Sequence, residues 1–361
     1  MGNKKKMLYI MGVHWEWIYQ RPHVIAEHLS RDYNVTVAYP VKIWDRHIVK
    51  NAERKPVEIR KLKMWTFPFQ RKSRLVGKIA DWYKKNLLRD YQQYAYIYIS
   101  YPTDVEYIPE DYKGALIYDC IDDYKQMCSD AYWQERIQRD ENILLKRSEI
   151  VFVTSQNLWK RKVDFCQNSL HLIRNGTGFS KIFDVKQEEK KKRYLIGYIG
   201  TIAEWFDFSL IKTSSRKYRE LEYHLIGPNL TTECQEDMGV IYDGIVEHDK
   251  LQEHVEEYDC MIMPFIVNEI VKAVDPVKLY EYIAFGKCII SVYYEELEYF
   301  REFVYFYRTE EEYSDLMERL IRQGFPPKYS VKQQEAFLTE NSWEERYRKI
   351  RQLIERLNPQ E

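Results

Sequence analysis

Several features that would assign a chain to a common class of protein are missing from this sequence. Its 361 residues carry 55 Lys and Arg against 56 Asp and Glu, a formal net charge of -1, so no excess of one sign predicts a polyanion partner. The six cysteines are scattered without a Cys-x-x-Cys pair, which argues against a zinc site or a disulfide framework and favours reduced, buried thiols. No apolar run is long enough to span a bilayer, and no segment resembles a signal peptide, so we expect a cytoplasmic protein.

Two further motifs are absent. Neither a Gly-x-Gly-x-x-Gly nor a Walker sequence occurs, which removes most of the support for dinucleotide oxidoreductases and P-loop enzymes. No metal-binding acidic motif is present in the C-terminal half. The sequence therefore predicts no metal and no bound cofactor.

Apolar runs typical of strands alternate with helical patterns in two series, which predicts an α/β protein with two domains. The length is sufficient for two cores. The charged run from Lys186 to Arg193 is the natural linker, so we expect an N-terminal domain over 1–185 and a second over 186–340. A long charged and aromatic helix is expected over 331–357, with 341–361 packing back on the first domain.

The most informative stretch is Asp275-Pro-Val-Lys-Leu-Tyr-Glu-Tyr-Ile-Ala-Phe-Gly286, which lies between two apolar runs. Pro276 in the first turn and Gly286 at the end predict a short helix between two strands. Lys278 and Glu281 then share one helical face near the end of a strand, where ligands of open α/β sheets collect. A carboxylate accepts hydrogen bonds from a diol, and an ammonium offsets phosphate charge. The alternative is a surface Glu–Lys pair.

A second candidate anion site follows the first strand of the C-terminal series, over 194–199. Gly200 and Thr201 come directly after this strand and before a helix expected from about Phe206. Backbone N–H groups at the start of a helix can bind an anion. Gly227, at the end of the next strand, is expected to approach a nucleobase.

Two stretches of the N-terminal half place polar side chains at strand ends. Gly12 follows the first strand, and Trp15-Glu-Trp-Ile-Tyr-Gln-Arg-Pro-His23 then opens a helix. Within it, Arg21 and His23 are candidate cleft residues. The alternative is that Arg21 packs or pairs structurally and that His23 is a helix-end residue.

The strand over 115–118 runs into Asp119-Cys-Ile-Asp-Asp-Tyr124, which clusters three carboxylates. A carboxylate that is partly desolvated beside other carboxylates has a raised pKa, which suits a general base. Asp122 and Asp123 are both candidates. The alternative is an acid-rich surface turn.

Residues 60–89 are strongly basic, with Asp81 the one acid among them, and aromatic residues are interleaved. A helix from about Ser73 would bring Leu75, Ile79 and Trp82 onto one side with lysines around them. That pattern suits an anionic membrane surface. The alternative is a solvated helix whose apolar stripe faces its own core. Nucleic-acid binding is not expected, because no recognisable motif accompanies the charge.

The stretch 275–286 resembles the donor-site helix of sugar-nucleotide glycosyltransferases with the GT-B fold, in the pattern Pro-x-Lys-x-x-Glu-Tyr-x-Ala-x-Gly-Lys. The Trp15–Pro22 segment (Trp-x-x-x-x-x-Arg-Pro), the Tyr-Asp-Cys-x-Asp-Asp run and Leu172-Ile-Arg-Asn-Gly176 resemble bacterial cell-surface polysaccharide glycosyltransferases, including the teichuronic-acid type and the inverting xanthan-type glucuronosyltransferases. The retaining enzymes of this fold usually carry another glutamate eight positions before the ribose-binding one, and Ala273 stands there. The resemblance therefore favours inversion.

The resemblance implies two Rossmann-like domains facing across a cleft, with a C-terminal helix that crosses back. It implies that Glu281 holds the donor ribose and that Lys278 faces the pyrophosphate. The expected donor-binding residues are Glu281, Lys278, Gly200, Thr201, Gly227, Val246 and Tyr280. The expected acceptor-side residues are Gly12, Trp15, Arg21, His23 and Asn175, with Asp122 or Asp123 as base.

The function implied is transfer of a sugar from a nucleoside diphosphate, UDP for preference, to a hydroxyl of a saccharide. The expected acceptor is lipid-linked, and the protein is expected at the inner face of the cell membrane. Two alternatives remain: a UDP-sugar 2-epimerase of the same fold, and a non-catalytic subunit that partners a true transferase.

Overall fold

The computed structural model describes residues 4–42, 59–70, 73–183, 185, 191–231, 239–246 and 251–357. The chain divides into two compact units, the first made of Met1–Arg174 with Arg346–Glu361 and the second of Asn175–Glu345. This division falls earlier than the expected boundary near 185. The reason is that Phe179 and Ile182, which precede the charged linker, already pack against the core of the second unit.

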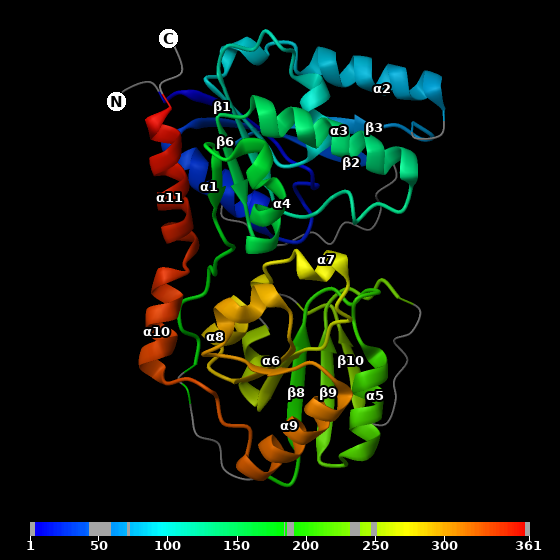
Figure 1. The fold of residues 1–361 in the computed structure, drawn as a ribbon, viewed down its shortest axis with the longest axis vertical. Coiled ribbons are helices and arrows are strands. Elements are labelled where there is room, and N and C mark those ends of the chain that lie inside the picture. The colour runs from blue at the N-terminus through cyan, green and yellow to red at the C-terminus, as the bar shows by residue number, and fades with distance from the viewer. Residues whose placement is uncertain are drawn as a thin grey trace. The chain divides into compact units, whose positions relative to one another are not determined.

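The described strands of the first unit form a parallel sheet in the order β3-β2-β1-β4-β5-β6-β7 (Figure 1). They are β1 (Lys6–Ile10), β2 (Asn34–Lys42), β3 (Arg60–Thr66), β4 (Tyr96–Ile99), β5 (Ala115–Cys120), β6 (Ile150–Val153) and β7 (Leu170–Leu172). The central strands are almost wholly buried, as expected for apolar runs in a parallel sheet. The strand order reverses between β1 and β4, which is where ligands bind in sheets of this kind.

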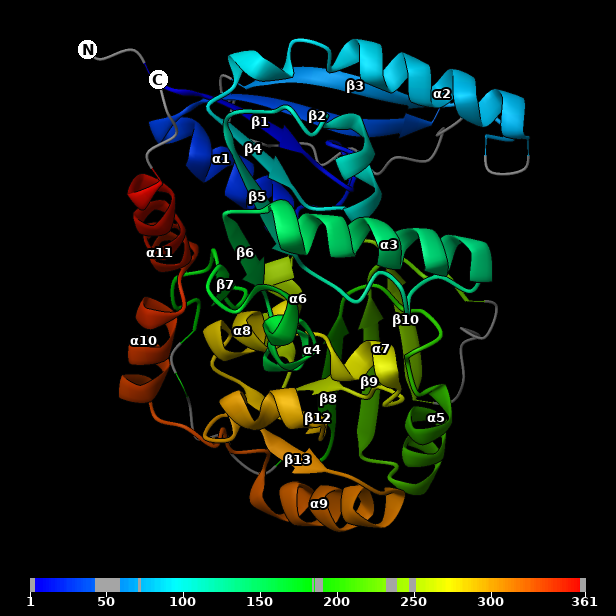
Figure 2. The same cartoon turned by 45° about the horizontal axis from the view of Figure 1, so that its top comes forward.

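The helices of the first unit are α1 (Arg21–Asp32), α2 (Arg74–Leu87), α3 (Ala131–Arg147) and α4 (Gln156–Cys166), with short 3-10 turns η1 (Tyr91–Gln93) and η2 (Pro102–Tyr107) (Figure 2). The last part of α11 (Trp343–Arg356) also belongs to this unit. There the Tyr347 hydroxyl donates to Asp32 at the end of α1 (2.6 Å), and Arg351 pairs with the same carboxylate (3.2 Å).

The second unit repeats the arrangement, with its described strands parallel in the order β10-β9-β8-β11-β12-β13. They are β8 (Tyr194–Ile199), β9 (Leu221–Ile226), β10 (Val240–Gly244), β11 (Cys260–Met263), β12 (Cys288–Val292) and β13 (Tyr305–Tyr307). The helices are α5 (Phe208–Lys217), α6 (Leu251–Glu257), α7 (Glu269–Lys272), α8 (Val277–Ala284), the 3-10 turn η3 (Glu295–Phe300), α9 (Glu310–Gln323) and α10 (Val331–Glu340). The order reverses between β8 and β11, so the ends of these two strands define the expected ligand site.

The single helix expected over 331–357 is wrong, because the chain forms α10 and α11 with a break at Asn341 and Ser342. The Asn341 side chain donates to the Phe337 carbonyl (2.8 Å) and accepts from the Tyr299 hydroxyl (2.6 Å), so it caps α10. Ser342 then forms an isolated bridge with Thr177. None of the described helices combines the length and the apolar character needed to cross a bilayer.

Candidate functional site

Two glycines shape the switch point of the second sheet. Gly200 follows β8 with φ +146°, and Gly227 follows β9 with φ +133°, conformations that side-chain-bearing residues rarely adopt. A Cβ atom on Gly227 would lie 2.2 Å from the Gly200 carbonyl oxygen, and one on Gly200 would lie 2.0 Å from Lys278 Cε. The two glycines therefore allow the strand ends to pack against each other and the Lys278 side chain to lie directly over Gly200.

Lys278 and Glu281 lie on α8 and are both half-buried. Burial lowers the pKa of Lys278, with Glu281 acting against this, and burial raises the pKa of Glu281 to about 7, with Lys278 acting against it. Neither side chain makes a hydrogen bond or ion pair with any residue that the structure describes. Two aromatic rings flank Lys278, with Nζ 5.8 Å from the ring centres of Tyr198 and Phe265. A half-buried cation and a half-buried carboxylate that lack hydrogen bonds and ion pairs are suited to a ligand that supplies these interactions.

The backbone around α8 is fixed by buried tyrosines. The Tyr282 hydroxyl accepts from the Ile199 N–H at the end of β8 (3.0 Å). Tyr280 was expected among the donor-binding residues, but it is fully buried and its hydroxyl donates to Asp275 (3.1 Å), so it holds the start of the helix and has no surface to offer a ligand. Asn175 is also buried, and its backbone N–H and side-chain amide donate to Asp275 (2.6 and 2.7 Å). Its expected role on the acceptor side is therefore wrong.

Two other expected donor residues border the glycine pair. Thr201 is half-buried, and its carbonyl accepts from the Tyr198 hydroxyl (2.8 Å). Val246 follows β10, half-buried against the core of the unit. Both come directly after strands that end at the same edge of the sheet, which keeps them as candidates.

In the first unit, Gly12 lies where β1 and β4 diverge. Its N–H donates to the Ser100 hydroxyl (3.1 Å), and a Cβ atom there would lie 2.9 Å from Tyr101 Cβ. Glycine at this position thus permits close packing of the two strand ends. Gly12 is half-buried and remains a candidate acceptor-side residue.

Arg21 is a structural residue. Its guanidinium is buried against the fully buried Asp119, with Nη2 2.9 Å from Oδ1, and it also donates to the Ile173 carbonyl (3.0 Å). This bidentate contact raises the pKa of Arg21, although burial acts against it. The expectation that Arg21 lines a cleft is therefore wrong, and the structural alternative holds. Asp119, its partner, was not singled out in the sequence.

Trp15 and His23 are also buried, against the expectation that they contact an acceptor. His23 Nδ1 accepts from the Gln20 N–H (3.3 Å), and Nε2 lies 3.2 Å from the His14 carbonyl, so the ring closes a capping box at the start of α1. Trp15 packs edge-on against this ring at 5.6 Å. The motif from Trp15 to His23 builds the start of the helix and presents neither side chain to a ligand.

Replacement of Asp119 by asparagine tests the buried pair. Removing one charge leaves the Arg21 guanidinium buried without a counter-charge, so Asp119→Asn should lower the free energy of unfolding by about 3–5 kcal/mol in urea titration. The control is Asp90→Asn, which removes an exposed pair with Arg89 (3.8 Å) and should change stability by no more than about 0.5 kcal/mol. Equal effects of the two variants would contradict the structural role of Asp119.

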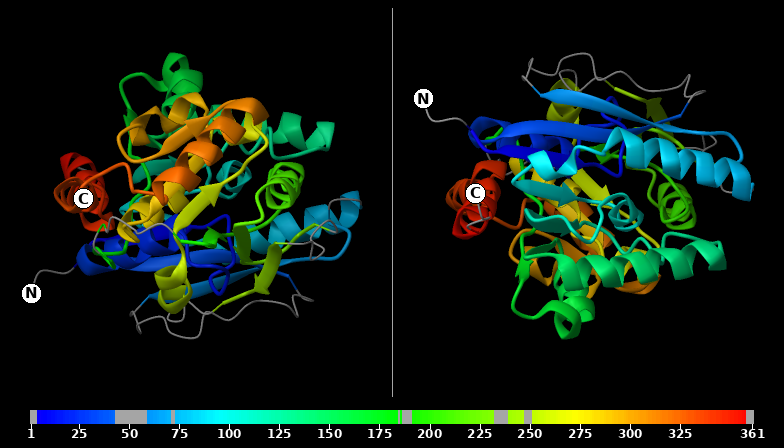
Figure 3. Two further views of the ribbon diagram at one scale, coloured as in Figure 1. Left: turned by 90° about the horizontal axis from the view of Figure 1, so that it is seen from below. Right: turned by 90° about the horizontal axis from the view of Figure 1, so that it is seen from above.

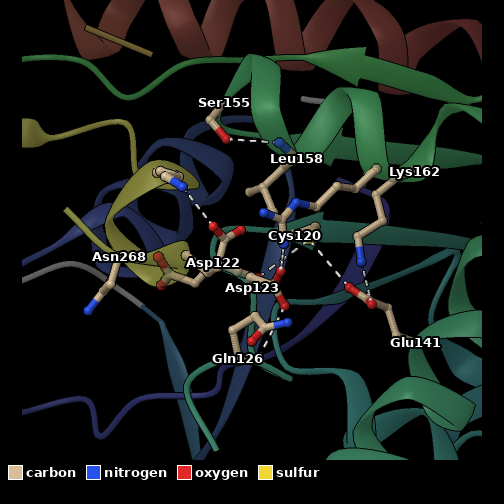
Figure 4. A network of polar contacts seen from close by, with 12 residues as sticks. Cys120, Asp122, Asp123, Gln126, Glu141, Ser155, Leu158, Lys162 and Asn268 are labelled. Carbon is tan, nitrogen blue, oxygen red and sulfur yellow. Dashed lines mark hydrogen bonds and ion pairs between the residues drawn. The ribbon is translucent and has the colours of Figure 1, made fainter. Parts of the chain in front are cut away.

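Asp122 and Asp123 follow β5, and their environments differ (Figure 4). Asp123 is buried, pairs with Arg161 of α4 (2.5 Å) and accepts from the Gln126 N–H (3.3 Å). Asp122 is half-buried and its carboxylate contacts no described hydrogen-bond donor. Burial and then Asp123 raise its pKa to about 6, with Arg21 acting against this. Of the two carboxylates, Asp122 has the properties of a general base.

The helix α4 holds this loop in place. Ser155 caps this helix: its hydroxyl accepts from the Leu158 N–H (3.1 Å), which fixes the start of α4 (Figure 4). Lys162, one residue after Arg161, pairs with the buried Glu141 of α3. Glu141 also accepts from the Tyr118 hydroxyl (3.0 Å) and lies 3.5 Å from the Cys120 sulfur. Neither Arg161 nor this network had been predicted, because the contacts join residues far apart in the chain.

Among the described residues, no group of three or more His, Cys, Asp or Glu side chains is placed to hold a metal ion. The structure thus gives two separate candidates: Lys278, Glu281 and the glycine pair in the second unit, and Asp122 with its neighbours in the first.

No protein-family model matches the sequence. It is 24% identical over 197 residues to the Bacillus subtilis (strain 168) protein named "Putative teichuronic acid biosynthesis glycosyltransferase TuaH", a match that covers 49% of this chain and 50% of that protein. The match therefore spans about half the length of the curated relative.

Solved structures resemble the chain over almost its whole length. Sucrose-phosphate synthase from Thermosynechococcus elongatus has a TM-score of 0.71 at 13% identity, covering 98% of this chain and 99% of that one. HepE of Anabaena, in complex with UDP and glucose, has a TM-score of 0.66 at 12% identity, covering 97% and 99%. The resemblance expected from the sequence, to transferases of the teichuronic-acid type, is confirmed, and the chain has the GT-B fold of glycosyltransferases.

Proposed function

We propose that the protein is a glycosyltransferase that moves a sugar from a nucleoside diphosphate to a hydroxyl of a saccharide. The observation that carries this proposal is the pair Lys278 and Glu281, half-buried without polar partners among the described residues, at the switch point of a Rossmann-type sheet. Its chemistry is complementary to a nucleoside diphosphate, which carries a diol and a pyrophosphate a short distance apart. A structural neighbour described in complex with UDP and glucose supports UDP as the nucleotide.

In the donor half, Glu281 accepts hydrogen bonds from the two ribose hydroxyls, and Lys278 offsets the charge of the pyrophosphate. The Thr201 N–H adds a donor to the same group, whereas the next N–H, of Ile202, already donates to the Pro228 carbonyl (2.9 Å). The nucleobase binds near Gly227, where the ends of β8 and β9 approach so closely that even a methyl group would collide with the backbone of Gly200. As the bond from the anomeric carbon to the diphosphate breaks, these groups stabilise the negative charge on the leaving group.

In the acceptor half, Asp122 takes the proton from the acceptor hydroxyl. That oxygen forms the new bond to the anomeric carbon, and the electron pair of the broken bond leaves with the diphosphate. Direct attack of this kind inverts the anomeric centre, in agreement with Ala273 at the position where retaining enzymes carry a glutamate. Asp123, neutralised by Arg161, positions the loop and does not act as base.

A melting-temperature screen tests the donor class. A ligand at about one hundred times its dissociation constant stabilises a protein by roughly 2.7 kcal/mol, which is a shift of several degrees. We expect such a shift with one UDP-sugar and smaller shifts with the same sugar on GDP, ADP or CMP. The free sugar at equal concentration is the control. A chain that no nucleotide stabilises would contradict the proposal.

A further inference from the structure

The outward face of α2 is apolar, which is the reverse of the usual arrangement for a helix on a protein surface. Leu75, Ile79 and Trp82 fall on one stripe and expose 70%, 48% and 68% of their surface, whereas Ala80 is the one described residue of this helix that is buried. The alternative, a solvated helix whose apolar stripe faces its own core, is therefore wrong. Single exposed apolar residues are ordinary, but three in register on one helix mark an interaction surface.

The same face is positively charged. Arg74, Lys78 and Lys85 are exposed beside the apolar stripe, and none of them makes a hydrogen bond or ion pair with another residue that the structure describes. The one acid of the helix, Asp81, is half-buried and accepts from the Tyr107 hydroxyl (3.3 Å). The face thus combines unneutralised cations with exposed aliphatic and aromatic side chains.

The turn before α2 adds a further exposed ring. Phe69 adopts φ +58°, which is unfavourable for a bulky residue, and exposes 71% of its surface. The turn is held by Gln70, whose side chain accepts from the Phe67 N–H (3.0 Å), and by the Ser73 N–H, which donates to the Phe69 carbonyl (2.7 Å). Backbone strain is thus retained at a position where the ring gains no burial, which is typical of a functional site.

The opposite face of α2 packs against the rest of the first unit. The outward face is therefore exposed in the folded unit and is not a misplaced part of its core. The Tyr83 hydroxyl donates to the Lys63 carbonyl of β3 (3.0 Å), and its ring packs edge-on against Phe67 at 5.8 Å. Lys84 donates to the Tyr107 hydroxyl (3.3 Å). Figures 2 and 3 show α2 lying beside β3, the described strand at one edge of the sheet.

We infer that the face formed by Leu75, Ile79 and Trp82 with Arg74, Lys78 and Lys85 docks on an anionic lipid surface. Cations attract the headgroups, and the apolar side chains enter the boundary between headgroups and acyl chains. A second copy of the chain is a poorer occupant, because it would bring two sets of unneutralised cations together. A nucleic acid would leave the aliphatic side chains without apolar contacts.

This inference deepens the proposed function and rests on it in one respect: a transferase that docks on lipid takes an acceptor saccharide carried by a lipid. The docking itself does not depend on donor chemistry. It is therefore measured without nucleotide, so that failure of one proposal is distinguishable from failure of the other.

The experiment is sedimentation of the full-length protein with vesicles of phosphatidylcholine alone and of equal parts phosphatidylcholine and phosphatidylglycerol. We expect binding to the anionic vesicles, weakened by added salt, and little binding to the neutral ones. Acyl chains labelled with bromine should quench tryptophan fluorescence in the wild type and less in Trp82→Phe. Absence of binding to anionic vesicles, or equal binding to both kinds, would overturn the inference.

Matched variants locate the surface. Each cation near an anionic membrane contributes about fivefold in affinity, so Lys78→Gln with Lys85→Gln should weaken binding by about 25-fold. The control removes two exposed lysines of the same unit outside α2, Lys113→Gln with Lys146→Gln, and should leave binding within about twofold. Equal losses in both variants, or a dimer in solution that the α2 variant abolishes, would overturn the inference. The nucleotide-induced melting shift should be unchanged in both variants.

Discussion

Asp122→Asn should lower the rate of sugar transfer by about 10²–10⁴-fold, because the amide cannot accept the proton of the acceptor hydroxyl. Donor affinity should be unchanged, since Asp122 and the donor residues belong to different units. The variant should fold at least as well as the wild type. Burial raises the pKa of Asp122 to about 6, so its ionisation disfavours the folded state at neutral pH, and a neutral amide removes that cost.

The pH profile distinguishes a base from a merely structural carboxylate. With a pKa of about 6, Asp122 is ionised at neutral pH and half-protonated near pH 6. The wild-type rate at saturating nucleotide sugar should therefore fall about tenfold for each pH unit below 6, and the residual activity of Asp122→Asn, measured in the same way, should lack this limb. Asp123→Asn is the companion variant, expected to have a smaller effect through loss of the Arg161 pair. Full activity in Asp122→Asn would exclude the base assignment, whatever the effect of Asp123→Asn.

Glu281→Ala should weaken binding of the nucleotide sugar by about one to two orders of magnitude, since hydrogen bonds to a charged acceptor contribute about 1.5–3 kcal/mol. Calorimetric titration measures this directly. Wild-type protein should also lose affinity for donors with a 2′-deoxy or 3′-deoxy ribose, whereas the variant should not distinguish them from the parent donor. Glu269→Ala, an exposed carboxylate of α7 paired with Lys272, is the matched control and should bind normally.

The pKa of Glu281 gives this second prediction a pH dependence. Burial raises it to about 7, so the carboxylate is largely protonated at pH 6 and ionised at pH 8. An ionised carboxylate is the stronger acceptor, and affinity for the nucleotide sugar should rise across this interval. The titration should use a nucleotide sugar as ligand and not free UDP. The terminal phosphate of free UDP itself loses a proton between pH 6 and 8, whereas the diphosphate of a nucleotide sugar, a diester, does not. Unchanged affinity in Glu281→Ala would contradict the assigned role.

Local patterns in the sequence predict the secondary structure around the candidate donor residues well. The spacing of Pro276, Lys278, Glu281 and Gly286 is that of a short helix after a buried strand, and α8 forms over Val277–Ala284 with its two charged residues on one face. Gly200 and Gly227 were singled out for an anion and a nucleobase, and the structure adds that both positions require glycine because the strand ends approach closely there.

The acceptor half shows what a sequence pattern does not determine. Trp15, Arg21, His23 and Asn175 stand in segments that resemble known transferases, but all four are buried. Their orientation depends on partners that are distant in the sequence, such as Asp119 for Arg21 and Asp275 for Asn175. The choice between Asp122 and Asp123 required Arg161 for the same reason.

Two other differences have similar origins. The strands β10 and β13 were not predicted, since they are short and only partly buried at the ends of their sheet, where the apolar signal is weak. The break between α10 and α11 was not predicted, because the sequence has a continuous helical pattern there. The break depends on the contact of Asn341 with Tyr299, which is distant in the sequence. The outward orientation of the α2 stripe likewise follows from the surface beneath the helix and not from its own periodicity.

Glycosyl transfer from a nucleoside diphosphate sugar is tested most directly by mass spectrometry of reactions that contain the purified protein, one nucleotide sugar and a lipid-linked saccharide extract. We expect a product heavier than the acceptor by one sugar residue, with nucleoside diphosphate released in equal amount, and about 10²–10⁴-fold slower formation of both with Asp122→Asn. Donors that remain intact with every acceptor, or that change only into an epimer, would contradict the assignment.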